Sequence, residues 1–176
     1  FESLQLELVD AVSSQVDFVE LHILCHHKIA VLLNEIGLAK GNPETLMETG
    51  VTSAFYPHGL GHLLGIQVHD VGGHYRDDNG LILNPPSEYP FLRLTRRLEV
   101  DQTLTIEPGM YVIDMLIDNL RESPGYELIN HDKLDWLRPY GGIRIEDNVR
   151  VLENGCENLT RIAFAEKKHT LTQKQS

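Results

Sequence analysis

The protein has 176 residues, 41% of them hydrophobic, which is enough for one domain with a sizeable core. Fifteen Lys and Arg against 26 Asp and Glu give a formal net charge of −11, which repels nucleic-acid phosphates and anionic lipids. We therefore expect neither nucleic acid nor a membrane as a partner, and no apolar run approaches the roughly 20 residues of a membrane-spanning helix.

Helical patterns dominate the first 50 residues. Apolar residues over 4–12 predict the end of one helix, and the polar residues that follow predict a loop. A second helix is predicted over 17–36, because Asp17 is a good N-cap residue and Gly37 stands where a C-cap glycine belongs. A short third helix is predicted over 43–47, with proline at the favoured first position.

The remainder of the chain is rich in strand and turn signals. Strands are predicted over residues 103–106, 110–113, 143–152 and 157–163. A short helix is predicted over 131–137, and Asn154-Gly155 is typical of a hairpin turn. Helices followed by strands indicate an α+β fold. No internal boundary interrupts the pattern, so we predict one unit over residues 1–165 and a polar tail over 166–176.

Histidines and glycines are concentrated between residues 58 and 70. His58-Gly-Leu-Gly-His62 is followed seven residues later by His69-Asp70. Imidazoles bind metals or transfer protons, and glycine lets the backbone approach a ligand closely. The segment therefore indicates a site, and the alternative is a polar loop with ordinary histidines.

A carboxylate, Glu107, follows the apolar strand predicted over 103–106, just before Pro108-Gly109 turns the backbone. A carboxylate in that position must be exposed, paired or metal-bound, because burying it alone is costly. The alternative to a functional role is a solvated strand end.

Arg144 and Glu146 are two residues apart in the strand predicted over 143–152. Their spacing places both side chains on one face, opposite Ile143 and Ile145. The two charges are compatible with a simple surface pair, but the adjoining glycines and apolar flanks favour a site.

One histidine and two carboxylates on separate segments, His62, Glu107 and Glu146, form a set of nitrogen and oxygen ligands. Such a set suits Mn²⁺, Co²⁺, Fe²⁺ or Zn²⁺ rather than a thiolate zinc site. Carboxylates can bridge two ions, but three ligands are too few to hold two metals. A two-metal centre would therefore need ligands from elsewhere.

These motifs together resemble the pita-bread metallopeptidases: methionine aminopeptidase, aminopeptidase P, prolidase and creatinase. The resemblance runs from about Phe1 to Arg161 and is greatest to the bacterial Xaa-Pro dipeptidase (prolidase) branch, which includes organophosphorus acid anhydrolases. It rests on four segments, which are Phe55-Tyr-Pro-His-Gly-Leu-Gly-His-Leu-Leu-Gly-Ile-Gln-Val-His-Asp-Val-Gly72, Tyr89-Pro-Phe-Leu-Arg93, Leu104-Thr-Ile-Glu-Pro-Gly109 and Gly141-Gly-Ile-Arg-Ile-Glu-Asp-Asn148.

The resemblance implies a centre with two divalent metal ions, most often Mn²⁺, with Co²⁺, Fe²⁺ or Zn²⁺ as alternatives. Its ligands follow the order Asp, Asp, His, Glu, Glu, and the last three match His62, Glu107 and the bridging Glu146. Nothing before His62 resembles the segment with the two aspartates, and the chain opens on Phe1 rather than Met. We therefore expect a carboxy-terminal fragment of the catalytic domain that is inactive alone.

The resemblance also implies roles for the other residues. His58 and His69 would contact the substrate, and Glu107 would shuttle a proton. Arg144 would bind the free carboxylate of the substrate, a task that suits a guanidinium fork. Val68 and Leu92 would help to line apolar pockets. The implied reaction is hydrolysis of Xaa-Pro dipeptides, with organophosphate esters as further substrates in some relatives.

Two other functions fit the same sequence. An aminopeptidase P would cut Xaa-Pro bonds in longer peptides, and a non-catalytic binding domain could use the same fold. Relatives commonly form homodimers, so we expect one. Two distant cysteines, Cys25 and Cys156, indicate the cytoplasm, and the alternative is a secreted protein with one disulfide.

The remaining histidines and the tryptophan are interpreted as structural. His22 and His26 are four residues apart on a predicted helix and mimic a metal pair, but the apolar stripe beside them favours packing. The residues that we expect at the surface are His74, His131 and His169. Trp136 is expected in the core or at an interface.

Overall fold

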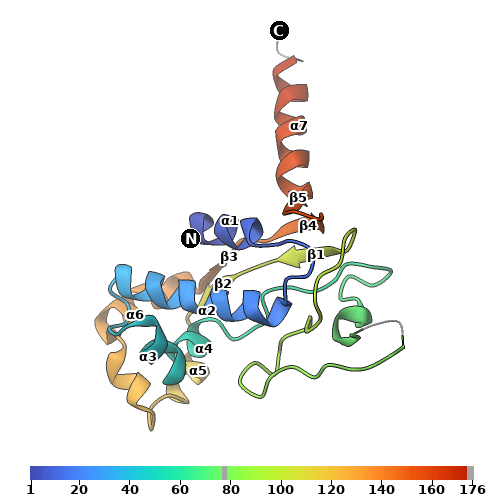
Figure 1. Ribbon diagram of the computed structural model, residues 1–176. Helices are drawn as coiled ribbons and strands as arrows, with labels where there is room; N and C mark the ends of the chain where they lie inside the picture. The colour runs from blue at the N-terminus through green and yellow to red at the C-terminus, as the bar shows by residue number, and fades with distance from the viewer. Residues whose placement is uncertain (77–78, 174–176) are drawn as a thin grey trace.

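A computed structural model describes the backbone of residues 1–76 and 79–173, and the side chains of these residues up to 167 (Figure 1). In this part the α-helices are α1 (Glu2–Asp10), α2 (Phe18–Glu35), α3 (Pro43–Glu48), α4 (Val51–Phe55), α5 (Asp114–Asp118), α6 (His131–Leu137) and α7 (Leu159–Gln173). The strands are β1 (Thr103–Ile106), β2 (Gly109–Tyr111), β3 (Gly142–Arg144), β4 (Asp147–Val151) and β5 (Cys156–Asn158). Short 3-10 helices occupy Val71–His74, Pro124–Leu128 and Arg138–Tyr140.

The helices predicted in the first 50 residues and α6 are confirmed, and their ends have local causes. The Asp17 side chain accepts a hydrogen bond from the Val19 amide at 2.9 Å and so begins α2. Gly37 adopts φ +68° directly after the helix C-cap, a conformation that favours glycine. The stripe that includes Phe18, Cys25 and Ile29 is fully buried.

The strands form two small antiparallel sheets. One has the order β1-β4-β5, and the other pairs β2 with β3. The strand predicted over 143–152 is therefore interrupted at Ile145-Glu146, since β3 pairs with β2 and β4 pairs with β1. The physical reason lies across the sheet, where Glu107-Pro108 separates β1 from β2 and Pro108 has no N–H to donate. The strand predicted over 110–113 is displaced to Gly109–Tyr111.

The strand predicted over 157–163 is wrong after Asn158. The return strand β5 covers only Cys156–Asn158, and α7 follows at once. Asn158 caps this helix, because its Oδ1 accepts a hydrogen bond from the Arg161 amide at 3.0 Å. The boundary predicted at residue 165 falls within α7, which stands away from the rest of the molecule (Figure 1).

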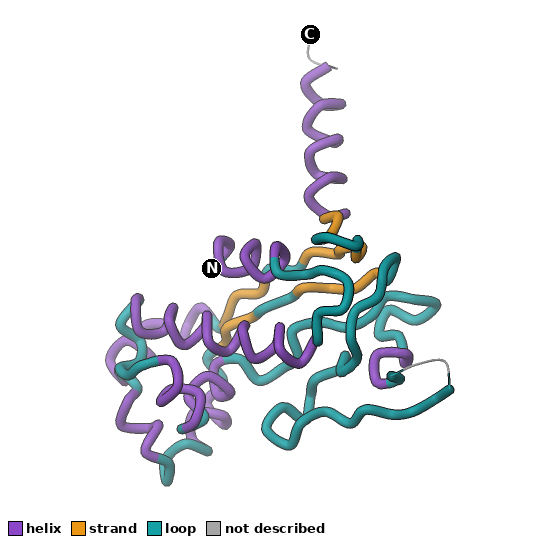
Figure 2. Tube along the Cα trace, in the orientation of Figure 1, coloured by secondary structure: helices purple, strands orange, loops and turns teal. Residues whose placement is uncertain are grey.

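One connected hydrophobic core joins the helices to the sheets. Buried side chains of α1 and α2, such as Leu8 and Phe18, belong to the same cluster as Ile106 of β1 and Val149 of β4. The strands lie centrally, with helices α3 to α6 gathered at one side and the long loops between α4 and β1 at the other (Figure 2). Among the helices of the described part, none has the length and apolar character that crossing a bilayer requires.

Candidate metal centre and substrate cleft

An extended segment, residues 60–64, runs antiparallel along β1 and places His62 in the site. The Glu107 amide donates to the Leu60 carbonyl at 2.8 Å, and the Thr105 amide donates to the His62 carbonyl at 3.0 Å. A β-carbon on Gly61 would lie 1.9 Å from the Thr105 carbonyl oxygen, so this approach requires glycine. His62 can therefore lie in this position only because residue 61 is a glycine.

His62 and Glu107 face one another in a nearly dry position. The two residues are 4% and 7% exposed. The Nδ1–H of His62 donates to the Leu63 carbonyl at 3.0 Å, and the other ring nitrogen, Nε2, lies 3.3 Å from Oε1 of Glu107. Two electron-pair donors at this distance need a proton or a metal cation between them. An imidazole fixed by a backbone carbonyl and aimed at a carboxylate is also the usual arrangement of a metal-binding histidine.

Glu107 is held by hydrogen bonds at both oxygens. The Thr105 hydroxyl donates to Oε1 at 3.1 Å, and Nη1 of Arg144 donates to Oε2 at 2.8 Å. Burial raises the pKa of Glu107, and the nearby Glu146 carboxylate raises it further, against the effects of Thr105, Arg144 and His62. Glu107 is therefore a carboxyl group suited to binding and releasing a proton.

Arg144, at the end of β3, and Glu146, between β3 and β4, both act on Glu107. Besides its bond to Glu107, Arg144 donates from Nε to the Tyr111 hydroxyl at 2.6 Å. Glu146 lies exposed at the interruption between β3 and β4. No group of three or more His, Cys, Asp or Glu side chains within the described residues is arranged to hold a metal ion. His62 and Glu107 thus fit part of a metal site, and Glu146 lies near them without completing it.

His58 and His69 flank the pair. The Nδ1–H of His58 donates to the Gly59 carbonyl at 2.8 Å, and its buried Nε2 has no hydrogen-bond partner within the described part. Burial lowers the pKa of His58, and the nearby Arg144 lowers it further. The His69 ring is exposed and meets the His62 ring edge-on, with the ring centres 4.4 Å apart.

A cleft of about 550 Å³ brings most of these residues together. The residues predicted for the site that line it are His58, His62, His69, Leu92, Glu107 and Arg144. Val68 is 70% exposed, and neither Val68 nor Glu146 is among the described residues that line the cleft. His74, expected at the surface, is partly buried and lines the cleft as well.

Sequence reasoning missed three contributors. Thr105 holds both members of the central pair, since its hydroxyl also accepts from the His62 amide at 3.0 Å. Tyr111 holds Arg144, and no pattern in the sequence indicated that role. Arg93 lines the cleft, and its guanidinium makes no hydrogen bond or ion pair within the described part. Arg93 belongs to the motif Tyr89-Pro-Phe-Leu-Arg93, and this motif was the only feature of the sequence that indicated a role for it.

The histidines interpreted as structural form a second cluster, which adjoins the site because the Tyr56 ring also contacts His58. His22 and His26 are each 1% exposed, their Nε2 atoms are 3.2 Å apart, and both rings pack against Tyr56 and Tyr89. The interpretation as packing is confirmed. Trp136 is 63% exposed, so it does not lie in the core, and its expected alternative place at an interface stays a prediction.

Two other expectations concern histidines outside these clusters. His131 is partly buried, and its Nε2–H donates to the Tyr126 carbonyl at 3.1 Å. His169 lies outside the residues whose side chains are described.

Comparison with known proteins defines the class. Residues 2–153 match metallopeptidase family M24, and the chain belongs to that family. The α+β pita-bread fold implied by the sequence is therefore confirmed, as is membership of a family of metallopeptidases that use divalent ions.

Individual proteins of known name show what the chain is similar to within this family. The chain is 49% identical over 160 residues to an Xaa-Pro dipeptidase of Shewanella loihica and 51% identical to that of Shewanella amazonensis, covering 91% of this chain in each case. It spans 36% of the length of these relatives. Among solved structures, Pseudomonas aeruginosa aminopeptidase PepP has a TM-score of 0.63 at 29% identity, with 91% of this chain and 29% of that chain covered. Zinc-substituted Escherichia coli aminopeptidase P in complex with product has a TM-score of 0.61 at 29% identity, with 90% and 29% covered.

Proposed function

We propose that this chain is the carboxy-terminal part of the catalytic domain of an Xaa-Pro dipeptidase. The observation that carries the proposal is Nε2 of His62 facing a Glu107 carboxylate oxygen at 3.3 Å within a cleft. Identity at about half of 160 aligned residues with proteins named Xaa-Pro dipeptidase supports the substrate class. In the domain division that we propose, residues 1–165 are the catalytic part and residues 166–176 are a polar tail.

In the proposed centre, His62, Glu107 and Glu146 would contribute ligands to two divalent metal ions. Mn²⁺ is the proposed metal, because nitrogen and carboxylate ligands without thiolates suit it, and Co²⁺, Fe²⁺ and Zn²⁺ are the alternatives. When bound, such ions lower the pKa of a water molecule and polarise the scissile carbonyl. Three ligands do not satisfy two ions, so further ligands would come from a segment outside these 176 residues.

The side chains of this chain would divide the remaining work. Glu107, whose pKa is raised by burial, would accept a proton from the attacking water and deliver it to the leaving nitrogen. Within the described residues His58 has an unpartnered Nε2, which would hydrogen-bond the substrate, and His69, whose ring contacts that of His62, would also contact the substrate. Stabilisation of the developing charge is the role that we propose for both histidines.

Recognition of the dipeptide would depend on one cation and two apolar side chains. Arg144 would bind the free carboxylate, because its guanidinium lines the cleft while Tyr111 and Glu107 fix its orientation. Leu92 would line an apolar pocket beside it, with Val68 as a second proposed lining residue. Organophosphate ester hydrolysis is proposed as a side activity of the same activated water.

An experiment on substrate length tests the assignment. A protein that joins this chain to the additional length of its dipeptidase relatives, loaded with Mn²⁺, should hydrolyse Ala-Pro. It should not hydrolyse Ala-Pro extended at its carboxyl end. Equal activity on both substrates would move the assignment to aminopeptidase P, the function named for the solved structures of similar fold. Loss of both activities despite bound metal would favour a non-catalytic binding domain.

The isolated chain provides an independent test. We propose that the 176 residues alone bind metal weakly and turn over no substrate, because they supply only part of the ligand set. Robust peptidase activity of the purified chain would contradict this. A homodimer and a cytoplasmic location complete the proposal. The location is supported by the free thiols of Cys25 and Cys156, which form no disulfide.

A further inference from the structure

A second pocket, of about 320 Å³, lies beside the substrate cleft. Pro57, His58 and residues 90–92 line both cavities and so form the wall between them. This wall is closely packed, because a β-carbon on Gly59 would lie 3.0 Å from the Cα of Leu92. The second pocket therefore adjoins the substrate cleft directly.

The side of the second pocket that it does not share with the cleft is mostly aromatic. We call this cavity the α2 pocket, and the residues that define it are His22 and His26 of α2, Ser53 of α4, Tyr56, Tyr89 and Leu116 of α5. The Tyr89 ring packs against both histidines, and its centre lies 4.6 Å from that of His22 and 4.7 Å from that of His26. The α2 pocket therefore offers ring faces and edges, which suit another aromatic ring.

The histidines of the α2 pocket have no ring nitrogen left for a ligand. Their Nε2 atoms are 3.2 Å apart, while Nδ1 of His22 lies 3.3 Å from the Tyr56 hydroxyl and Nδ1 of His26 lies 3.0 Å from the Thr52 hydroxyl. Burial lowers the pKa of both rings, so they are uncharged at physiological pH. This wall therefore favours a group that is neutral and makes few hydrogen bonds.

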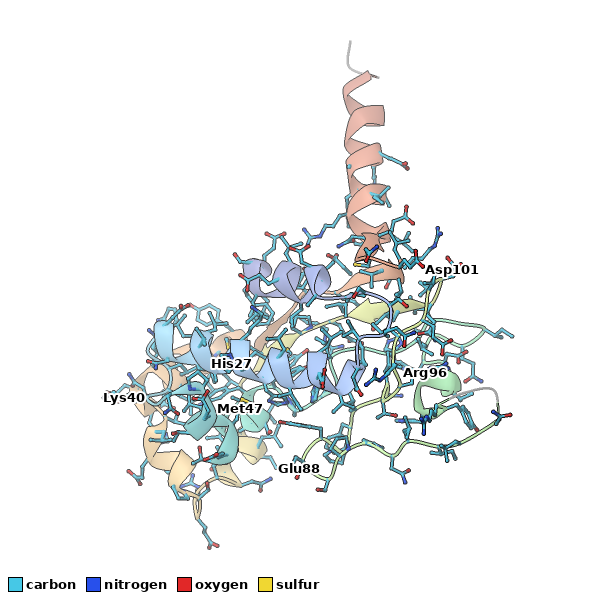
Figure 3. All side chains as sticks on the ribbon, in the orientation of Figure 1. His27, Lys40, Met47, Glu88, Arg96 and Asp101 are labelled. Atoms are coloured by element: carbon cyan, nitrogen blue, oxygen red, sulfur yellow. The ribbon has the colours of Figure 1, made fainter. Side chains whose placement is uncertain are left out.

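The formal charge in the described lining of the α2 pocket is at its rim. Glu88 is exposed and lies on the long loop before β1, at the outer edge of the molecule (Figure 3). Its carboxylate accepts a hydrogen bond from the Ser87 hydroxyl at 3.0 Å. A carboxylate in this place repels an acidic ligand and leaves a neutral one unaffected.

The size of the α2 pocket and its position relative to Arg144 indicate which part of a dipeptide reaches it. An apolar cavity of about 150 Å³ holds a benzene molecule, so this pocket has room for an aromatic side chain. Arg144, which would bind the free carboxylate of proline, does not line the α2 pocket. The proline ring is also too small to fill it. The remaining group of an Xaa-Pro dipeptide is the side chain of the residue before proline.

We propose that the α2 pocket binds the side chain of the residue before proline and selects an aromatic one. The ring would leave water and pack against Tyr89 and the two histidines, and both effects stabilise the bound substrate. The inference rests on the Xaa-Pro dipeptidase function proposed above and adds its preferred substrate, of which Phe-Pro is the simplest example.

The test compares kcat/KM for Phe-Pro and Ala-Pro in the Mn²⁺-loaded protein that joins this chain to the additional length of its relatives. The wild-type protein should prefer Phe-Pro at least about tenfold. Ser53→Trp would fill the α2 pocket with an indole ring. It should lower kcat/KM for Phe-Pro at least about tenfold and leave that for Ala-Pro within about twofold.

A control and a second variant keep the test decisive. Ser14→Trp is the matched control, because Ser14 is also half-buried but lies outside the lining of the α2 pocket, and it should change neither substrate. Ser87→Trp would close the pocket from its rim, where Ser87 is exposed, so this variant should fold even if Ser53→Trp does not. Urea midpoints of all three variants measure their folding.

The outcomes separate this inference from the function on which it rests. Equal kcat/KM for Phe-Pro and Ala-Pro in the wild-type protein would overturn the inference alone. Equal losses on both substrates in the folded pocket variants would also overturn it, as would a preference for Glu-Pro over Phe-Pro. If the wild-type protein hydrolyses neither dipeptide, the proposed function fails and the inference fails with it.

Discussion

The molecule contains two pairs of histidines that are each four residues apart, and they have opposite surroundings. His22 and His26 lie on α2 among tyrosine rings, with their remaining ring nitrogens near the hydroxyl groups of Tyr56 and Thr52. His58 and His62 lie on an extended, glycine-rich segment beside β1, and His62 faces a buried carboxylate. The spacing of histidines therefore does not separate the two pairs, whereas the charge of the group that they face does.

The two pairs also differ in the protons that they bind. Burial lowers the pKa of His22 to about 3 and that of His26 to about 4, so both are neutral at physiological pH. Among the described residues, no acidic side chain makes a hydrogen bond or ion pair with either ring. The helix pair is thus a neutral hydrogen-bonded element of the core, and the cleft pair is part of a charged site.

The largest predicted effect separates the pairs by activity. In an active form of the enzyme, Glu107→Gln should lower kcat by about 10²–10⁴-fold, because the group that moves the proton is lost. His22→Gln should leave kcat within about threefold, since neither histidine of α2 lines the cleft that holds Glu107. Hydrolysis of Ala-Pro at saturating metal measures both, and equal losses in the two variants would remove the distinction.

The second prediction concerns stability and pH. The pKa values of His22 and His26 are lower in the folded chain than the unperturbed value of about 6.5, so the unfolded chain binds their protons first. The stability that they contribute is fully present above about pH 6.5 and is lost as the pH falls toward 4. The loss approaches about 1.4 kcal/mol per pH unit for each histidine. Urea unfolding between pH 7 and pH 4.5 should show this slope, and it should be smaller in His26→Gln.

The third prediction tests the backbone that carries the cleft pair. Gly61→Ala should destabilise the chain by about 3 kcal/mol or more, because the new methyl group would overlap the Thr105 carbonyl. Gly72→Ala is the control, since its β-carbon would lie 3.0 Å from an Asp70 carboxylate oxygen and in ordinary contact with Leu63, without overlapping any backbone atom. Urea midpoints measure both variants, and similar midpoints would show that residues 60–64 do not lie against β1 as described.

The smallest predicted effect concerns the orientation of Arg144. Tyr111→Phe removes the hydroxyl that accepts from Nε at 2.6 Å and leaves the bond to Glu107 intact. A single hydrogen bond of this kind contributes about 1 kcal/mol. KM for the dipeptide should therefore rise about fivefold with little change in kcat. A lower kcat at unchanged KM would show that Tyr111 acts on the reaction rather than on substrate binding.

Local signals predicted most of the elements, and tertiary contacts decided the rest. Helix α2 was predicted because the cap at Asp17, the apolar stripe and Gly37 are all local features. The interruption between β3 and β4 was not, because it reflects the path of Glu107-Pro108 on the opposite strands. Helix α7 was missed for a similar reason, since its base is fixed by Asn158 and by the distant Asp147.

The residues of the site likewise fall into those that were predicted from the sequence and those that were not. His62 and Glu107 were predicted because histidine, carboxylate and glycine together leave a strong signal in sequence. Thr105 and Tyr111 were not, because a hydroxyl on a strand has no evident role until the strands pair. Glu146 was predicted as a ligand, and in this structure it lies exposed beside the pair rather than in the cleft lining. Its place as a ligand stays a prediction.

Mn²⁺ binding to the 176-residue chain, followed by electron paramagnetic resonance, tests the distinction between the two histidine pairs most directly. We predict weak binding by the wild-type chain, at least about tenfold weaker binding by His62→Gln, and unchanged binding by His22→Gln. Weaker binding in His22→Gln with no change in His62→Gln would contradict the account, because the metal ligand would then belong to the pair on α2.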